Sequence, residues 1–394
     1  MAKKLRIDWF MFAVAASLAL FGSVMVYSAS AMISLKETAN HPDGPTQFQY
    51  FFKQFGFTII GLAIMFAASK IDYRIFNNKF IVYGLVAITG LLLLVVFGFP
   101  AINGARRWIR MPGFSFQPSE LAKVVLPIFL AYFLTKNEKT IGDLKETVLP
   151  CLLILGGMGG LIMLEPDLGT TIVLCAVFVT VYFAAGAKIL HIVSVGAALL
   201  LIGVGALILA PWRMARLMAF LNPWENSEGS AYQVVQGLYA IGSGGIMGEG
   251  FAKGQQKLFY LPYPYSDFIF AVVGEELGLI GTLAVVVAFG LLLWRGTRAA
   301  LMAPDRFGML LGIGIITGLI VQALFNISVV ISILPAKGIP LPFISYGGSS
   351  ILVTLGAVGI LLNISQYAGF VSIGTRADDE EKPRRKRRGK LGLK

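Results

Sequence analysis

Long apolar blocks constrain this chain more than any other feature of its sequence. A helix of about 20 residues spans the hydrocarbon core of a bilayer. Only 14% of the residues are charged, whereas about 25% are charged in an average soluble domain. We therefore predict an all-α polytopic integral membrane protein. Its ten expected transmembrane helices cover residues 9–32, 52–69, 79–98, 118–135, 147–164, 169–186, 189–210, 268–293, 307–333 and 343–369.

The first block follows a short basic segment, as the apolar region of a signal peptide would. Residues 9–32 exceed the roughly 7–15 residues of such a region, so we expect a retained first span. Cys151 and Cys175 both lie inside apolar blocks, which predicts no disulfide framework.

Lysine and arginine are unequally distributed over the connecting segments. With the N-terminus in the cytoplasm, the short cytoplasmic loops are consistently basic, as the positive-inside rule requires. We predict a membrane domain over residues 1–370 with both ends cytoplasmic. A disordered basic tail follows over residues 371–394, and it is either attracted to anionic lipids or simply anchors the topology.

The longest connection, residues 211–266, is expected as a large outer loop between spans seven and eight. Loops of this length are uncommon in compact domains unless they are functional or disordered. We expect a functional loop with an interfacial helix over residues 232–241. Residues 242–248 (GSGGIMG) do not match the G-x-G-x-x-G pattern and follow no strand, so no nucleotide site is predicted.

Three carboxylates, Asp267, Glu275 and Glu276, lie where this loop enters the eighth span. Charged groups in membrane helices are costly and usually functional. On one continuous helix, Glu275 would lie about 12 Å below Asp267, inside the bilayer. We expect Glu275 and Glu276 to cap or pair with neighbouring helices. Asp267, at the water boundary among aromatic residues, is the candidate general base.

Two other motifs place charges at helix ends. In QPSELAK, Glu120 and Lys123 are three residues apart and can pair, and a structural salt bridge and a functional role are equally open. In EPDLG, the proline and glycine predict a tight outer turn. We expect Glu165 to be solvated there and Asp167 to point inward.

Five arginines on the outer side run against the positive-inside trend. Solvated loop charges are one interpretation. Guanidinium groups also bind phosphate oxygens in bidentate geometry, so the pattern favours an anion site for a lipid-linked phosphate or diphosphate. The five are Arg106, Arg107, Arg110, Arg213 and Arg216.

Six motifs are spread over the membrane part: NGARRWI at 103–109, QPSELAK at 117–123, EPDLGT at 165–170, YQVVQGLYAIGSGGIMGEG at 232–250, SDFIFAVVGEELGLIG at 266–281 and KGIPLPFISYGGSS at 337–350. Together they resemble the SEDS family (shape, elongation, division and sporulation) of bacterial peptidoglycan glycosyltransferases. The likeness runs from the first span to about Ser365. QKLFYLP and GEELG are more similar to the FtsW and sporulation branch than to the RodA branch.

The resemblance implies polymerisation of lipid II, a disaccharide-pentapeptide on undecaprenyl diphosphate, into β-1,4-linked glycan. The reaction would take place at the outer face of the bacterial cytoplasmic membrane. Asp267 of the DFIF motif would be catalytic, and Ser345 and Gly347 would have structural or supporting roles.

The chain departs from the family pattern just before Asp267. Tyr263 stands where an acidic residue is usual, Tyr265 where a histidine is frequent, and Ser266 where threonine is usual. A proton-shuttling role for these neighbours is therefore in doubt, whereas the role of Asp267 is not.

The implied reaction inverts the anomeric carbon in a single displacement. Asp267 would take the proton of the acceptor 4-hydroxyl while cationic groups stabilise the departing diphosphate. The expected substrate-binding residues are Arg106, Arg107, Glu120, Lys123, Asp167, Arg213 and Arg216. A divalent cation such as Mg²⁺ or Mn²⁺, held by Asp267 and another carboxylate, would stabilise the same charge, and the sequence does not choose between them.

Two other functions compete with polymerisation. A lipid II flippase would also use ten spans and Gly/Pro-interrupted helices, but its site should lie near the midplane, and the informative charges lie near the outer surface. A scaffold that recruits other division proteins would leave the charged cluster without a purpose. The resemblance implies a class B penicillin-binding protein (transpeptidase) as partner and no nucleic acid. A division role is expected, with elongation and sporulation left open.

Overall fold

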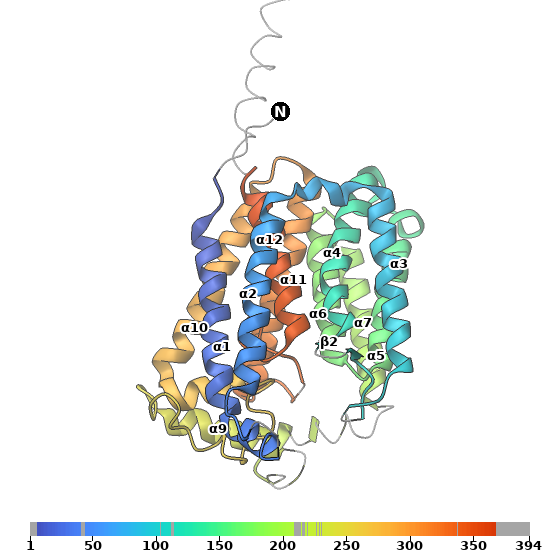
Figure 1. Cartoon of the computed structure of the whole chain (residues 1–394). Helices are drawn as coiled ribbons and strands as arrows, with labels where there is room; N and C mark the ends of the chain where they lie inside the picture. The colour runs from blue at the N-terminus through green and yellow to red at the C-terminus, as the bar shows by residue number, and fades with distance from the viewer. Residues whose placement is uncertain are drawn as a thin grey trace, which may run out of the picture.

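The chain folds into a bundle of α-helices, shown by the computed structural model in Figure 1. The structure describes residues 6–40, 44–102, 104–111, 114–208, 214, 217–218, 220–225, 227, 229, 231–336 and 338–367. Its long helices are α1 (Trp9–Glu37), α2 (Gln49–Lys70), α3 (Lys79–Val95), α4 (Pro118–Lys136), α5 (Leu149–Leu164), α6 (Leu168–Ala184), α7 (Ile189–Ile208), α9 (Tyr232–Gly244), α10 (Ile269–Leu301), α11 (Arg306–Val330) and α12 (Gly348–Ser365). Short helical turns are η1 (Tyr73–Asn77), η2 (Val96–Gly98), η3 (Glu138–Thr140) and η4 (Leu144–Val148).

Eight helical segments in the described part are long and apolar enough to cross a membrane. Two shorter apolar helices, Leu168–Ala184 and Ile189–Gly205, occupy the sixth and seventh predicted spans. Each of the ten predicted segments therefore contains a helix, and the all-α polytopic membrane protein is confirmed. The count of ten spans stays a prediction.

Two helices begin at the outer end with residues that are favourable at a helix N-terminus. Asp167 precedes α6, and its carboxylate accepts a hydrogen bond from the backbone N–H of Thr170. Pro118 is the first residue of α4, a position where its missing N–H costs no intrahelical hydrogen bond. Such residues satisfy or remove N–H groups that a helix terminus otherwise leaves unpaired, so they set where the span begins.

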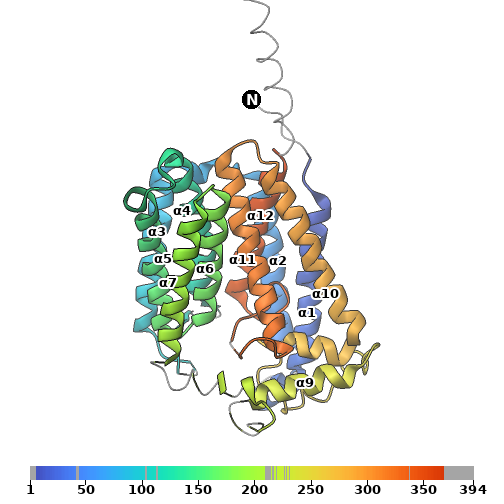
Figure 2. The same ribbon diagram turned by 180° about the vertical axis from the view of Figure 1, so that it is seen from behind.

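Helices α4, α11 and α12 form the centre of the bundle. Helix α11 packs against α4, α6 and α10, and α12 packs against α2. Most of the apolar stretch of α4 and α11 is buried, whereas α2 and α3 expose most of theirs. Figure 2 shows α7 at one edge of the bundle, where it packs on α6.

Charged residues join helix ends at the predicted cytoplasmic end. The guanidinium of Arg295 in α10 donates to the carboxylate of Asp8, which precedes α1. Arg74 in η1 pairs with Asp305 at the start of α11, at 3.1 Å. Exposed pairs of this kind contribute little stability, about 0–1 kcal/mol each, so apolar packing holds the bundle together.

The opposite end of the bundle carries α9 and the longer connections. Helix α9 confirms the helix predicted over residues 232–241, and it lies across the ends of the long helices (Figure 1). A short antiparallel pair, β1 (Ile109–Met111) and β2 (Phe114–Phe116), is an element that the sequence did not predict, because three residues are too few for a strand period. Arg213, Arg216 and the tail over residues 371–394 lie outside the described residues.

Helix α10 breaks at Gly278, inside the span predicted over residues 268–293, and the sequence did not predict this break. The backbone of Gly278 has φ 63° and ψ −158°, in the half of φ space that glycine enters readily. Residues after α9 satisfy the backbone groups at the break. The Leu279 N–H donates to the Gly245 carbonyl at 2.9 Å, and the Gly250 N–H donates to the Glu276 carbonyl at 3.0 Å. Figure 2 shows α10 bending next to α9.

The glycine-rich run after α9 permits this contact. A Cβ atom at Gly244 would overlap the carbonyl oxygen of Gly274, and one at Gly248 would overlap the carbonyl of Glu276. The run therefore serves close packing of two backbones, which explains its glycines without a phosphate ligand.

We predict that Gly244→Ala destabilises the fold while Gly242→Ala does not. The new methyl group at residue 244 would collide with backbone, whereas a Cβ at Gly242 meets nothing within 4 Å. Overpacking of this kind costs roughly 1–3 kcal/mol or more. Thermal unfolding in detergent should show a lowered Tm for Gly244→Ala alone. Equal Tm values for the two variants would show that the loop does not pack against α10 in this way.

Candidate active site

The candidate residues gather at the end of the bundle that carries α9. They belong to segments distant in sequence: the turn between α5 and α6, the first turn of α4, the stretch before α10, and the connection between α11 and α12. Three consecutive residues of that last connection, Gly338, Ile339 and Pro340, touch the other segments and hold them together.

Asp267 is half-buried immediately before α10. Its Oδ2 atom lies 2.7 Å from the position that a Cβ of residue 338 would occupy, so a side chain at that position would displace the carboxylate. The side-chain amide of Asn326 in α11 donates to the Asp267 carbonyl at 2.8 Å and to the Ile339 carbonyl at 2.7 Å. Asn326 therefore positions Asp267 and its neighbouring loop together, and the sequence analysis missed it.

Ser345 joins the same two loops. Its hydroxyl donates to the Ser266 carbonyl at 2.7 Å and accepts from the Leu341 N–H at 2.8 Å. The amide of Gln54 in α2 donates to the Ser345 carbonyl and accepts from the Gly347 N–H, both at 3.2 Å. Ser345 and Gly347 thus connect the start of α12 to α2 and to the residue before Asp267.

Glu120 and Lys123 form the predicted pair. The Lys123 Nζ lies 2.7 Å from Glu120 Oε2, and both side chains are buried. Lys123 also donates to Gln322 Oε1, and the Gln322 amide donates to the Pro340 carbonyl at 2.8 Å. A buried ion pair stays favourable only when further hydrogen bonds accompany it. This one links α4 through α11 to the loop beside Asp267.

Arg107 binds the turn between α5 and α6. Its Nε donates to the Glu165 carbonyl at 2.9 Å, and its Nη2 donates to the Pro166 carbonyl. Because a guanidinium has five N–H groups, these two bonds orient it and leave donors for an anion. Arg106 is more exposed and donates to the Phe97 carbonyl at 2.8 Å, and Arg110 is exposed.

Glu165 is not solvated, and that expectation is wrong. Its side chain is fully buried, and neither carboxylate oxygen has a hydrogen-bond partner. The turn was expected at the water surface, but Arg107 covers it by binding its carbonyls. Burial, reinforced by the nearby Asp167 charge, raises the pKa of Glu165 to about 8.

Asp167 points inward, as expected, and is 4% exposed. Its carboxylate accepts hydrogen bonds from the backbone N–H and the hydroxyl of Thr170, at 3.1 and 2.8 Å. Two residues further on, a Cβ at Gly169 would overlap the side chain of Ile339. Since Gly338 touches Asp267, the turn at Asp167 and the Asp267 carboxylate lie on two sides of one short loop.

Glu275 and Glu276 are buried and bind the outer loop, and Glu276 also contacts α1. Glu275 Oε1 accepts from the backbone N–H groups of Gln255 and Gln256. Glu276 Oε1 accepts from Ser28 in α1 and from Lys257, at 2.6 and 2.5 Å. The expected pairing with a neighbouring helix is confirmed for Glu276. The depth of Glu275 in the bilayer stays a prediction.

Metal ligands from the protein alone are few at this end. Within the described residues, no group of three or more His, Cys, Asp or Glu side chains is placed to hold a metal ion. Mg²⁺ typically takes one or two carboxylates and completes its shell with water and substrate phosphate. Asp267 fits such a site when a diphosphate supplies the remaining oxygens.

The arrangement suits proton transfer beside an anion. Asp267 supplies a half-buried carboxylate at the end of the bundle, and the hydrogen bond from Asn326 fixes its backbone. Arg107 presents a partly bound guanidinium on the neighbouring turn. A base and a cation at the same end of the bundle are the two groups that displacement of an anionic leaving group by a hydroxyl requires.

Comparison with known proteins shows a match over nearly the whole chain. The sequence model of the cell cycle proteins FtsW, RodA and SpoVE matches residues 8–369. The chain is 42% identical over 366 residues to a probable peptidoglycan glycosyltransferase FtsW of Geobacter metallireducens, covering 91% of this chain and 95% of that one. It is 40% identical to stage V sporulation protein E of Bacillus subtilis, covering 93% and 99%.

Solved structures show the same fold. A chain from a peptidoglycan synthase complex that coordinates polymerisation and crosslinking superimposes with a TM-score of 0.72 at 27% identity, covering 92% of this chain and 98% of that one. The rod shape determining protein RodA of Thermus thermophilus gives a TM-score of 0.66 at 28% identity, covering 93% and 98%.

We predict that Glu165→Gln stabilises the protein at alkaline pH. The unfolded state ionises Glu165 near its usual pKa, whereas the folded state keeps it protonated up to about pH 8. The wild type therefore has its full stability below the usual pKa and loses it as pH rises towards 8, by about 1.4 kcal/mol per unit of pKa difference. Glutamine removes this loss. Unfolding of both proteins between about pH 5 and pH 8 measures it, and parallel curves would show that Glu165 is ionised and paired.

Proposed function

Because this chain belongs to the cell cycle protein family of FtsW, RodA and SpoVE, we propose that it polymerises lipid II into β-1,4-linked glycan, with Asp267 as the general base. It is a peptidoglycan glycosyltransferase. The observation that carries the mechanistic assignment is the placement of Asp267 at the outer end of the bundle, against Gly338 and under the amide of Asn326.

The distribution of buried charge supports an enzyme over a flippase. In the described part of the chain, the buried charged residues are Glu120, Glu165, Asp167, Lys257, Glu275 and Glu276. All of them lie in segments at the end that carries α9. A transport site would place its charges near the middle of the bilayer, so this distribution favours chemistry at the outer surface.

In the proposed step, Asp267 takes the proton of the acceptor 4-hydroxyl. That oxygen attacks the anomeric carbon of the donor while the bond from this carbon to the diphosphate breaks. The proton goes to the Asp267 carboxylate and the electron pair leaves with the diphosphate. Configuration at the anomeric carbon inverts because attack and departure occur on opposite faces.

The departing diphosphate needs positive charge beside it. Arg107 suits this role because its bonds to the α5–α6 turn already fix its guanidinium, and Arg106 lies next to it. Lys123 is held by Glu120 and Gln322. We assign Lys123 and Asp167 to the polar side chains that line the proposed diphosphate site. Arg213 and Arg216 stay proposed contacts. A Mg²⁺ or Mn²⁺ ion bound by Asp267 and the diphosphate would add Lewis-acid stabilisation.

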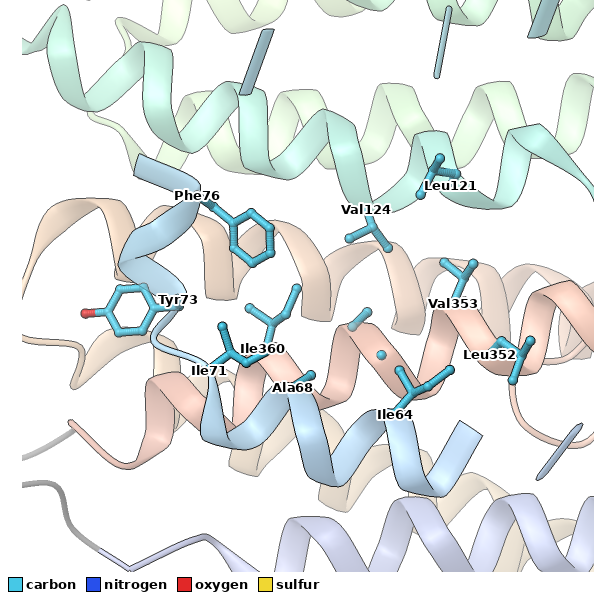
Figure 3. A pocket seen from close by; sticks show the side chains of 12 residues that line it. Ile64, Ala68, Ile71, Tyr73, Phe76, Leu121, Val124, Leu352, Val353 and Ile360 are labelled. Atoms are coloured by element: carbon cyan, nitrogen blue, oxygen red, sulfur yellow. The ribbon is translucent and has the colours of Figure 1, made fainter. Parts of the chain in front are cut away.

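An apolar groove of about 340 Å³ between α2, α4 and α12 is the proposed site of a polyprenyl chain. Figure 3 shows Ile64 and Ala68 of α2 facing Leu352 and Val353 of α12, with Val124 of α4 beside them. Lipid tails are as apolar as these side chains, so the groove gains little hydrophobic energy. It would orient the tail instead.

The groove reaches the polar pair of the candidate site. Val124 and Val353 also line a small cavity that contains Glu120, Lys123 and Gln322. A chain lying in the groove would therefore bring its diphosphate towards these residues. We propose this as the path of the lipid carrier.

We further propose the cellular setting. The chain would lie in the bacterial cytoplasmic membrane with both termini cytoplasmic, its basic tail near anionic lipids. A class B penicillin-binding protein would be its transpeptidase partner, because the solved chain that superimposes with a TM-score of 0.72 belongs to a peptidoglycan synthase complex. Identity to FtsW proteins favours septation and contacts with other division proteins, and the identity to a sporulation protein keeps a sporulation role as the alternative.

We expect Asp267→Ala to abolish polymerisation of labelled lipid II by the purified protein with its transpeptidase partner. General-base catalysis contributes about 10²–10⁴-fold to a rate, so the loss should reach at least about a hundredfold. Glu249→Ala, which removes an exposed carboxylate from the same outer loop, is the matched control and should polymerise normally. Glycan chains from Asp267→Ala at the wild-type rate would move the base to Glu120 or Asp167.

Blocking the groove should raise the KM for lipid II. Leu352→Trp places a larger apolar side chain into the groove, and because the tail does not react, loss of its binding should raise KM and leave kcat nearly unchanged. We expect a rise of about three- to tenfold, on the order of 1 kcal/mol. Leu91→Trp, on the exposed face of α3, is the control. Equal KM values in wild type and both variants would place the tail elsewhere.

A further inference from the structure

Three tyrosines from distant segments pack against one another in tilted and edge-to-face contacts at the outer end of the bundle. Tyr50 lies at the start of α2, Tyr265 precedes α10, and Tyr346 precedes α12. The ring centroids are 4.8 Å apart for Tyr50 and Tyr265, 5.0 Å for Tyr50 and Tyr346, and 5.7 Å for Tyr265 and Tyr346. Each of the three residues is half-buried, so the cluster is partly accessible from the outside.

The cluster is attached to the backbone that carries Asp267. The Tyr346 N–H donates to the Tyr265 carbonyl at 2.9 Å, and the next residue, Ser266, accepts the hydroxyl of Ser345. Tyr265 is two residues from Asp267. A molecule that lies on these rings therefore lies beside the proposed base.

A carboxylate completes the cluster. Tyr50 donates its hydroxyl proton to Glu37 Oε2 at 2.8 Å, and the Tyr265 ring lies against that of Tyr50. Glu37 ends α1 and is exposed. Since a carboxylate can accept about four hydrogen bonds, Glu37 retains acceptor capacity for hydroxyl groups of a ligand.

The loop that leads to Tyr265 holds further aromatic rings in the open. Phe259, Tyr260 and Tyr263 are 54%, 56% and 48% exposed. Phe259 and Tyr263 have φ values of 68° and 50°, which cost a bulky residue roughly 1–2 kcal/mol each. Strain of this kind is concentrated at functional sites, and here it accompanies aromatic side chains that face outward.

Aromatic faces next to a carboxylate match the chemistry of a saccharide. A sugar ring offers C–H groups to the face of an aromatic ring and hydroxyl donors to a carboxylate. A membrane-interface belt would also use tyrosines, but belt residues face lipid singly, whereas these rings contact one another and are tied to Glu37.

We infer that Tyr50, Tyr265 and Tyr346, with Glu37, form a saccharide-binding surface that holds the glycan strand beside Asp267. The inference rests on the proposed function and deepens it. A strand held here would be retained between successive additions, so the surface would control the length of the glycan product.

Two measurements on the full-length protein test this surface. The first is the affinity for a lipid-free peptidoglycan tetrasaccharide, and the second is the glycan length made from lipid II with the transpeptidase partner. Tyr50→Ala and Tyr265→Ala should weaken tetrasaccharide binding about tenfold, the scale expected for loss of one aromatic contact, and should shorten the glycan. Tyr265→Phe keeps the ring and should bind within about twofold of wild type.

Two variants complete the design. Glu37→Gln alters an exposed side chain, so it tests the surface even if an alanine variant fails to fold, and it should weaken tetrasaccharide binding severalfold. Phe52→Ala removes a ring on α2 that is 66% exposed and outside the trio, and it should leave binding and length unchanged.

The outcomes separate this inference from the proposed function. Wild-type affinity and glycan length in Tyr50→Ala, Tyr265→Ala and Glu37→Gln would overturn the saccharide surface while leaving the polymerase intact. Loss of co-purification with the transpeptidase partner in these variants, with tetrasaccharide affinity unchanged, would also overturn it in favour of a protein interface. A wild type that binds the tetrasaccharide through these residues but makes no glycan would support the surface and overturn the proposed function.

Discussion

The amide of Asn326 donates to the carbonyls of Asp267 and Ile339, and the remaining contacts of the candidate site depend on this double hydrogen bond. It holds the α11–α12 connection against the bundle. Residues of that connection contact the other segments of the candidate site. Gly338 lies against the Asp267 carboxylate, Ile339 packs on Gly169, and the Pro340 carbonyl accepts from Gln322. Buried backbone carbonyls must find donors, and the side-chain amides of Asn326 and Gln322 on α11 supply them to this loop.

Polar groups elsewhere at the outer end follow the same principle. Arg107 binds carbonyls of the α5–α6 turn, Glu275 and Glu276 bind N–H groups of the loop after α9, and Gln54 binds both sides of Ser345 and Gly347. A loop that crosses the end of an apolar bundle has little hydrophobic surface of its own to bury. Buried side chains on helices and at turns therefore fix it, which explains why so many polar residues of this chain lie at one end.

This arrangement bears on how polymerisation would proceed. The proposed base, the proposed diphosphate ligand Arg107 and the three clustered tyrosines all adjoin one connected set of loops, while the apolar groove opens between α2, α4 and α12. Donor lipid, leaving group and growing strand would then approach one rigid centre from different sides.

The sequence by itself determined the membrane class, the ten apolar helices, the α9 helix, the Glu120–Lys123 pair and the candidacy of Asp267, because hydrophobic length and local spacing govern these features. It could not determine the break of α10 at Gly278, the burial of Glu165 or the roles of Asn326, Gln322 and Gln54. Each of these features depends on contacts with residues far away in the sequence. At the break, for example, the N–H of Leu279 donates to the carbonyl of Gly245. Such pairings leave no periodic pattern in the sequence, and only the packed bundle decides them.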